Sequence, residues 1–118
     1  MRRVLVAHVR EALEELSDRA MQRDLWLASE GPRVGSFVEA VEQLYDDSGL
    51  IDVLHDGRAD EELGPQAANL LRELVAVLES IDDRTVGPAE LIDSLAMERV
   101  RTLAREALNV IPPPVRGA

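Results

Sequence analysis

Residues 65–81 read PQAANLLRELVAVLESI, with apolar side chains recurring every three to four positions. This is the period of one face of an α-helix. The face consists of Ala67, Leu70, Leu71, Leu74, Leu78 and Ile81. Ala68, Val75 and Val77 widen it to more than half of the circumference, and Pro65 suits a first helical turn. We therefore expect a helix over 65–81 that is packed on several sides and lies at the centre of the fold.

The residues before this stretch predict one long helix and two shorter ones. An apolar stripe predicts the long helix from about Val4 to Met21, with an extension to Ala28 left open. The stripe consists of Leu5, Val9, Ala12, Leu16 and Ala20. Ser36 to Glu39 has the spacing of a capping box, so a second helix should run from Ser36 to about Asp46.

A short third helix is expected over 50–55, capped by Asp47 or Ser48 and ended by Gly57. Residues 58–63 are polar and are expected to form a loop. Pro88 predicts the start of a short fifth helix, which should end near Leu95. A sixth helix should follow over 97–111, since residues 112–114 are all proline and cannot continue it.

These patterns predict an all-α fold, a compact bundle of five to six helices of which two are short. The length of 118 residues suits a single domain over 1–118, with residues 112–118 as a Pro-rich tail. If the other helices do not cover the wide apolar face of 65–81, the chain should form a homodimer through that helix or through the last one.

Composition excludes several functional classes. The chain has no cysteine, which rules out disulfides and cysteine-based metal sites. The net charge of −10 argues against a nucleic-acid partner, because phosphate binding needs a cationic surface. No apolar run has the length of a membrane span or a leader, so we expect a cytoplasmic protein without membrane contact. All thirteen basic residues are arginine, which suggests a GC-rich, bacterial source.

The charge is concentrated in residues 46–62, which we call the acidic segment. Seven carboxylates and one arginine, Arg58, give it a net charge of −6. The candidate partner-binding residues are Asp46, Asp47, Asp52, Asp56, Asp60, Glu61 and Glu62, with Tyr45 as a central anchor. One interpretation is a docking surface for a basic protein, which such a patch would attract over a long range. The alternative is that these side chains cap helices and solvate a loop.

No catalytic, metal or cofactor motif is present in the sequence. Asp52, Asp56 and Asp60 match three positions of an EF-hand loop, but Leu54 and Leu63 stand where oxygen ligands are needed. His8 and His55 are the only histidines, and no nucleophile is marked beside either. We therefore predict no enzyme activity, no cofactor and no metal site.

Trp26 and the arginines of the last helix each allow two interpretations. Trp26, the only tryptophan, is expected in the core or at a corner, with an interface anchor as the alternative. Arg99, Arg101 and Arg105 lie close together along the sixth helix. They would form a small anion site or compensate the dipole at the end of the helix.

The function predicted from these observations is a non-enzymatic protein–protein interaction module that docks to or neutralises a basic protein. Small acidic helical proteins include immunity proteins that block basic nucleases, and the likeness is one of charge and fold class. The alternatives are a subunit of a homo-oligomer or larger assembly, and a small metal- or ligand-binding helical enzyme.

Overall fold

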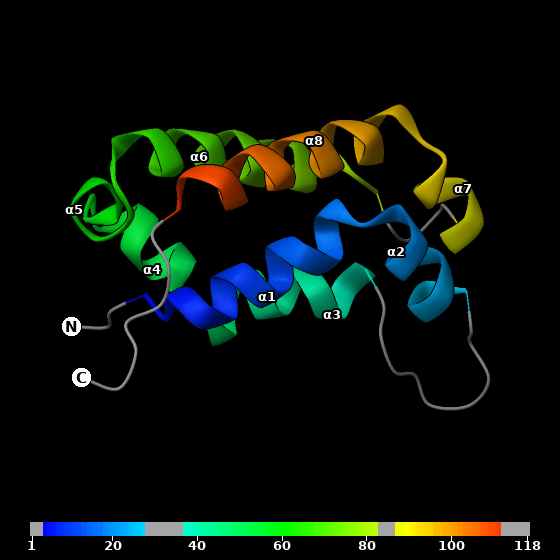
Figure 1. Ribbon diagram of the computed structural model, residues 1–118, viewed down its shortest axis with the longest axis horizontal. Helices are drawn as coiled ribbons and strands as arrows, with labels where there is room; N and C mark the ends of the chain where they lie inside the picture. The colour runs from blue at the N-terminus through cyan, green and yellow to red at the C-terminus, as the bar shows by residue number, and fades with distance from the viewer. Residues whose placement is uncertain (1–3, 28–36, 83–86, 112–118) are drawn as a thin grey trace.

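The computed structural model describes residues 4–27, 37–82 and 87–111 (Figure 1). These residues form eight α-helices and one π-helix, and none of them is in a β-strand. The elements are α1 (Val6–Ser17), α2 (Arg19–Trp26), α3 (Phe37–Glu42), the π-helix η1 (Gln43–Asp47), α4 (Leu50–His55), α5 (Ala59–Leu63), α6 (Pro65–Ser80), α7 (Pro88–Ile92) and α8 (Leu95–Val110). The predicted all-α class is confirmed, whereas the predicted five to six helices are too few.

The core forms where α8 packs against both α6 and α1. Figure 1 shows α6 and α8 side by side, with α1 along the other side of α8. Ala104 and Ala107 of α8 are fully buried, and their small side chains let neighbouring helices approach. Leu74 of α6 and Leu16 of α1 are also fully buried, and each such leucine stabilises the fold by about 1.5–3 kcal/mol. The predicted helix over 65–81 is confirmed as α6, but the central position belongs to α8.

The predicted first helix is divided in two at Asp18. Asp18 has extended backbone angles (φ −113°, ψ 103°), which interrupt the path between α1 and α2. Its carboxylate accepts a hydrogen bond from the Met21 amide (3.0 Å), so it caps the N-terminus of α2. Leu5 and Ala20, the two ends of the predicted stripe, are exposed. Leu5 precedes α1 and Ala20 follows the break, so neither continues the buried face.

Trp26 lies in the core at the end of α2. Its side chain is 4% exposed, and its Nε1 donates a hydrogen bond to Oε2 of Glu15 (2.7 Å). Its ring meets Phe37 edge to face, with 5.7 Å between the ring centroids. The predicted core position of Trp26 is therefore confirmed.

The second predicted helix is α-helical only to Glu42. The π-helix η1 follows directly and ends at Asp47, one residue beyond the predicted end. In η1 the Ser48 amide donates to the Gln43 carbonyl five residues back (3.1 Å). Ser48 is buried, and its Oγ accepts from the Leu50 amide (3.1 Å) at the start of α4. The N-cap residue of α4 is Gly49, so the predicted cap at Asp47 or Ser48 is wrong by position, although the Ser48 hydroxyl does contact the first helical amide. The predicted third helix has the bounds of α4, and the capping serine predicted for the second, Ser36, lies outside the described residues.

Residues 58–63, predicted to be a loop, contain the helix α5. Ala59 and Leu63 are four residues apart on one face of it, and both are buried. The three acidic residues between them lie in the first turn, where the helix dipole favours negative charge. Gly64 joins α5 to α6 with φ at +90°, a conformation that a side chain would strain. These two apolar side chains pack α5 onto the core.

The short helices occupy opposite ends of the molecule. In Figure 1, α4 and α5 lie at the end where α1 begins, whereas α2 and α7 lie at the other end. The Leu5 amide donates to the Ser48 carbonyl (2.7 Å), which ties the start of α1 to the α4 end. The end formed by α4 and α5 therefore carries most of the acidic segment. The predicted proline tail, residues 112–118, lies outside the described residues.

Candidate functional site

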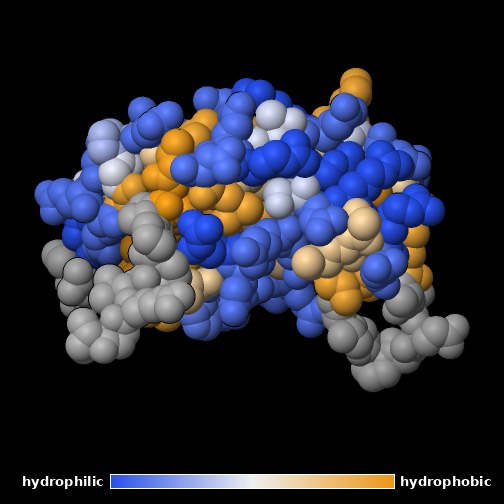
Figure 2. Space-filling view, in the orientation of Figure 1, coloured by the Kyte–Doolittle hydropathy of each residue, from blue (hydrophilic) through white to orange (hydrophobic). Residues whose placement is uncertain are grey.

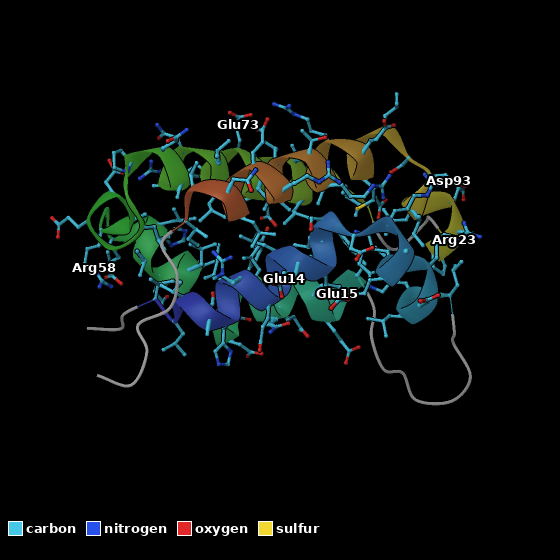
Figure 3. The ribbon with its side chains drawn as sticks, in the orientation of Figure 1. Glu14, Glu15, Arg23, Arg58, Glu73 and Asp93 are labelled. Carbon is cyan, nitrogen blue, oxygen red and sulfur yellow. The ribbon has the colours of Figure 1, made fainter. Side chains whose placement is uncertain are left out.

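The structure brings the acidic segment together at the α4–α5 end. Its carboxylates come from η1, α4, the turn after α4, and α5. Six of the seven residues are exposed, and Glu62 is half-buried. Figure 3 shows Arg58, the one arginine of the segment, at this end of the molecule, and Asp93 of the turn after α7 at the opposite end.

Arg58 organises part of the acidic segment. Its guanidinium contacts Oδ2 of Asp56 (3.0 Å) and Oε2 of Glu62 (2.8 Å), and its side chain is only 15% exposed. The other carboxylate oxygen of Glu62 accepts a hydrogen bond from the Val4 amide (2.8 Å). Asp56 and Glu62 therefore hold the α4–α5 turn and the start of α1 together, a role that neither the docking interpretation nor the capping interpretation predicted.

Asp60 belongs to a second network that reaches α6. Arg72 donates one hydrogen bond to Oδ1 of Asp60 (3.1 Å) and another to Oδ1 of Asn69 (2.9 Å). Both Asp60 and Arg72 are exposed, so their ion pair contributes at most about 1 kcal/mol. Its importance is positional, because it links the acidic segment to the outer face of α6.

Tyr45, the predicted anchor, is half-buried on η1 rather than fully presented to solvent. Its hydroxyl donates a hydrogen bond to Oε2 of Glu79 on α6 (3.2 Å). Burial, and then the negative charge and the hydrogen bond of Glu79, raise the pKa of Tyr45 far above its ordinary value. The hydroxyl of Tyr45 thus links η1 to α6, and the use of Tyr45 as an anchor stays a prediction.

Titration of the protein should show this environment directly, because Tyr45 is the only tyrosine. The phenolate absorption band is expected to appear well above pH 10, and Glu79→Gln should move its midpoint back toward the ordinary value. The unfolded chain loses the proton first, so stability should fall as the pH rises past 10. An ultraviolet titration with a midpoint near 10 in the folded wild type would contradict the contact with Glu79.

The residues considered for metal binding do not converge. Among the described residues no three His, Cys, Asp or Glu side chains lie close enough to hold a metal ion. Asp52, the first residue of the EF-hand-like pattern, lies inside α4 rather than in a loop. His8 on α1 and His55 on α4 are both exposed.

The three arginines of α8 have separate roles. Arg101 is only 6% exposed, and its Nη1 donates to Oε1 of Gln22 (2.9 Å), which is itself fully buried. Burial lowers the pKa of Arg101, the nearby charge of Arg19 lowers it further, and that of Glu98 opposes these effects. Arg99 pairs with Glu73 of α6 (2.7 Å), and Arg105 donates to the carbonyl of Ser17 (3.2 Å).

Sequence patterns did not single out the buried pair of Gln22 and Arg101. Nε2 of Gln22 also donates to the carbonyls of Glu15 (3.0 Å) and Leu16 (2.8 Å) at the end of α1. Gln22 therefore satisfies the Leu16 carbonyl, which the break at Asp18 leaves without a helical partner, and adds a second donor to the Glu15 carbonyl, which also accepts from the Asp18 amide (3.4 Å). The sequence did contain one signal for the burial of Arg101. Arg101 lies on the same face of α8 as Met97 and Ala104, which are buried.

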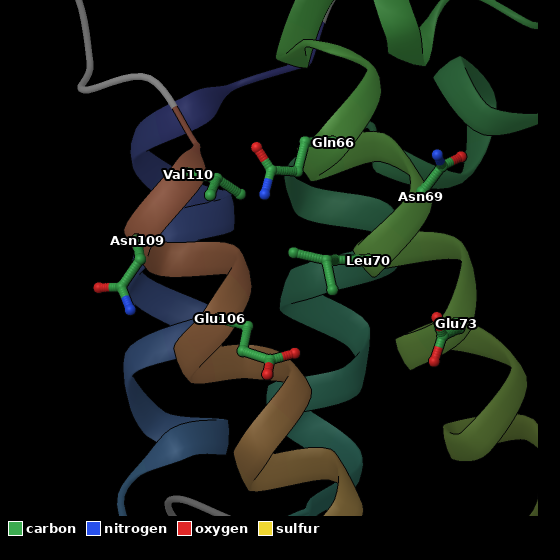
Figure 4. Close-up of a pocket in the computed structure, with 7 residues that line it drawn as sticks. All are labelled: Gln66, Asn69, Leu70, Glu73, Glu106, Asn109 and Val110. Atoms are coloured by element: carbon green, nitrogen blue, oxygen red, sulfur yellow. The ribbon is translucent and has the colours of Figure 1, made fainter.

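A groove lies between α6 and α8, with a volume of about 470 Å³. Its lining residues are Gln66, Asn69, Leu70, Glu73, Glu106, Asn109 and Val110. Figure 4 shows Leu70 and Val110 extending from the two helices toward the space between them, with Gln66 alongside. In Figure 2 an apolar area is visible on this side of the molecule, bordered by hydrophilic side chains. Sequence reasoning missed the groove, because its lining comes from residues on two helices that only the fold brings together.

The chain belongs to the family described as Domain of unknown function (DUF7945), whose model matches residues 3–111. No curated protein and no solved structure matches the chain. In the described part of the chain, no helix has both the length and the apolar character needed to cross a lipid bilayer.

Proposed function

We propose that the protein is a non-catalytic protein–protein interaction module that docks to a basic partner through the acidic segment. The observation that supports this is the gathering of seven carboxylates at the α4–α5 end, six of them exposed. Arg58 and Arg72, which pair with three of them, still leave a net charge of −5. An immunity- or inhibitor-like role is the most specific form of this proposal, and a bacterial, cytoplasmic setting stays a prediction from composition.

Charge of this kind acts mainly on the rate of association. A patch of one sign attracts the oppositely charged partner across about 8–10 Å at physiological salt, and added salt weakens the attraction. The paired carboxylates still contribute to the field, because the arginines neutralise only part of it. We therefore expect binding that is strong at low salt and falls at moderate salt.

The test is an affinity pull-down from lysate of the source organism, at low and then at moderate salt, with three baits. The first is the wild-type chain, and the second carries Asp47→Asn, Asp52→Asn and Glu61→Gln, one change each in η1, α4 and α5. The third is a control with the same change of charge at exposed residues outside the acidic segment, namely Glu14→Gln, Asp24→Asn and Glu90→Gln.

The expected result is a basic protein that the wild type and the control capture at low salt and that the acidic-segment variant retains several-fold less. Mass spectrometry identifies the captured protein, and thermal melts confirm that all three baits are folded. Equal capture by all three baits would show that the acidic segment is only a solvated surface.

A second candidate, self-assembly, is supported by exposed apolar side chains at the other end of the molecule. Leu95 at the start of α8 is 84% exposed, and Leu25 on α2 is 38% exposed. Sedimentation velocity over a range of concentrations tests this candidate. A dimer that Leu95→Gln converts to a monomer would favour it over a monomer that awaits a different partner.

A further inference from the structure

We propose that the groove between α6 and α8 receives a basic amphipathic helix of the partner, as an extension of the acidic segment. This inference rests on the proposed function and specifies which kind of structural element of the partner binds. The groove offers an apolar floor, amide groups along its sides and two carboxylates, a combination that fits a helix with one apolar and one cationic face.

The pattern of the lining supports a helical occupant. On α6 the lining residues are 66, 69, 70 and 73, and on α8 they are 106, 109 and 110. Both sets follow the three-to-four-residue spacing of one helix face, so the groove extends over about two turns, or roughly 10 Å. Leu70 and Val110 are both half-buried and leave part of their apolar surface open. An apolar side chain of a third helix would cover that surface.

The charges of the groove select a basic occupant. Glu106 is exposed on α8, and among the described residues no ion pair is formed by its carboxylate. Glu73 pairs with Arg99 at a contact where both side chains are more than half exposed, so a cation of the partner can compete for it. An arginine or lysine beside the buried face of the incoming helix would meet one of these two carboxylates.

The groove is also continuous with the acidic segment. Asn69, at its rim, accepts a hydrogen bond from Arg72, and Arg72 contacts Asp60 of α5. The acidic segment and the groove therefore share one connected surface around the junction of α5 and α6. In this arrangement the acidic segment attracts the partner and the groove then holds it.

The test titrates the full-length protein, labelled with ¹⁵N, with a designed peptide of about 18 residues. The peptide carries leucine on one helical face and arginine on the other, and a peptide of the same composition in scrambled order serves as control. Glu106→Lys removes the groove charge, with Glu14→Lys on exposed α1 as its matched control. Leu70→Gln removes part of the apolar floor, with Val38→Gln, at a residue that is 46% exposed on α3, as its matched control.

We expect the largest amide shifts at residues 66–73 and 106–110, and weaker binding of the scrambled peptide. Glu106→Lys and Leu70→Gln should each weaken binding about tenfold, which is about 1.4 kcal/mol. The two control variants should change it less than about twofold, and thermal melts verify folding of all variants.

The peptide is also titrated into the acidic-segment variant, with Asp47→Asn, Asp52→Asn and Glu61→Gln. Three results would overturn the inference. Shifts confined to α4 and α5, with affinity lost only in the acidic-segment variant, would remove the groove and leave the proposed function standing. Self-association of the free protein that Glu106→Lys abolishes would assign the groove to a second copy of the chain. The absence of salt-sensitive binding by either peptide would count against the groove and the proposed function together.

Discussion

Replacing Leu74 with alanine should lower the free energy of unfolding by about 3 kcal/mol. Leu74 is fully buried on α6, the helix that packs along α8. Truncation of a buried leucine loses its transfer free energy and leaves a cavity, which together cost about 2–5 kcal/mol. In a chain of this length the core is small, so few other buried side chains can offset the loss. The measurement is equilibrium unfolding in urea, followed by the fluorescence of Trp26, the only tryptophan.

Leu70→Ala is the matched control for this prediction. Leu70 lies four residues earlier on α6, but it is half-buried at the edge of the groove. The same truncation there should cost about 1 kcal/mol, since much of the side chain already meets water. If both variants lost the same stability, the difference in burial between Leu74 and Leu70 would be contradicted.

Gln22→Leu should also destabilise the protein strongly, by about 3 kcal/mol, although leucine is similar in volume and apolar. The substitution removes the donor to the Glu15 and Leu16 carbonyls and the acceptor for Arg101. The Leu16 carbonyl and the Arg101 guanidinium would then lose their buried partner, whereas the Glu15 carbonyl keeps the bond from the Asp18 amide. A lost hydrogen bond to a charged group alone costs about 1.5–3 kcal/mol. Urea unfolding measures the effect.

Two further variants separate the polar contacts of Gln22 from its packing. Gln43→Leu removes an exposed hydrogen bond to Glu11 and should change stability by less than about 0.5 kcal/mol. The double variant with Arg101→Met should lose less than the sum of the two single variants, because the two side chains contact each other. Additive losses, or a Gln22→Leu protein as stable as the wild type, would contradict this arrangement.

The long helices were predictable from sequence because their apolar side chains repeat over many turns. The predicted bounds over 65–81 differ from those of α6 by one residue at the C-terminus, and the short helix α4 was predicted at its observed bounds. The failures lie where a few residues determine the structure. Asp18 lies within an uninterrupted helical period, so its role as a cap that breaks the helix was hidden. In α5 only Ala59 and Leu63 are apolar, so composition favoured a loop.

The candidate site was predictable only as a concentration of charge. The sequence places seven carboxylates in residues 46–62, and the fold gathers them at one end. The role of each carboxylate depends on which arginine the fold brings into contact with it. Arg72, which contacts Asp60, is twelve residues away in the sequence. The groove requires α6 and α8 to be neighbours, and helical periodicity gives no information about which helices pack together.

The most direct test of the proposed interaction is the salt dependence of the dissociation constant for the captured partner. It should be measured for the wild type, the acidic-segment variant and the charge-matched control defined above. We expect the dissociation constants of the wild type and of the charge-matched control both to rise steeply between low and moderate salt. The acidic-segment variant should bind about tenfold more weakly at low salt and respond less to added salt. A dissociation constant independent of salt, or equal for all three proteins, would contradict docking through the acidic segment.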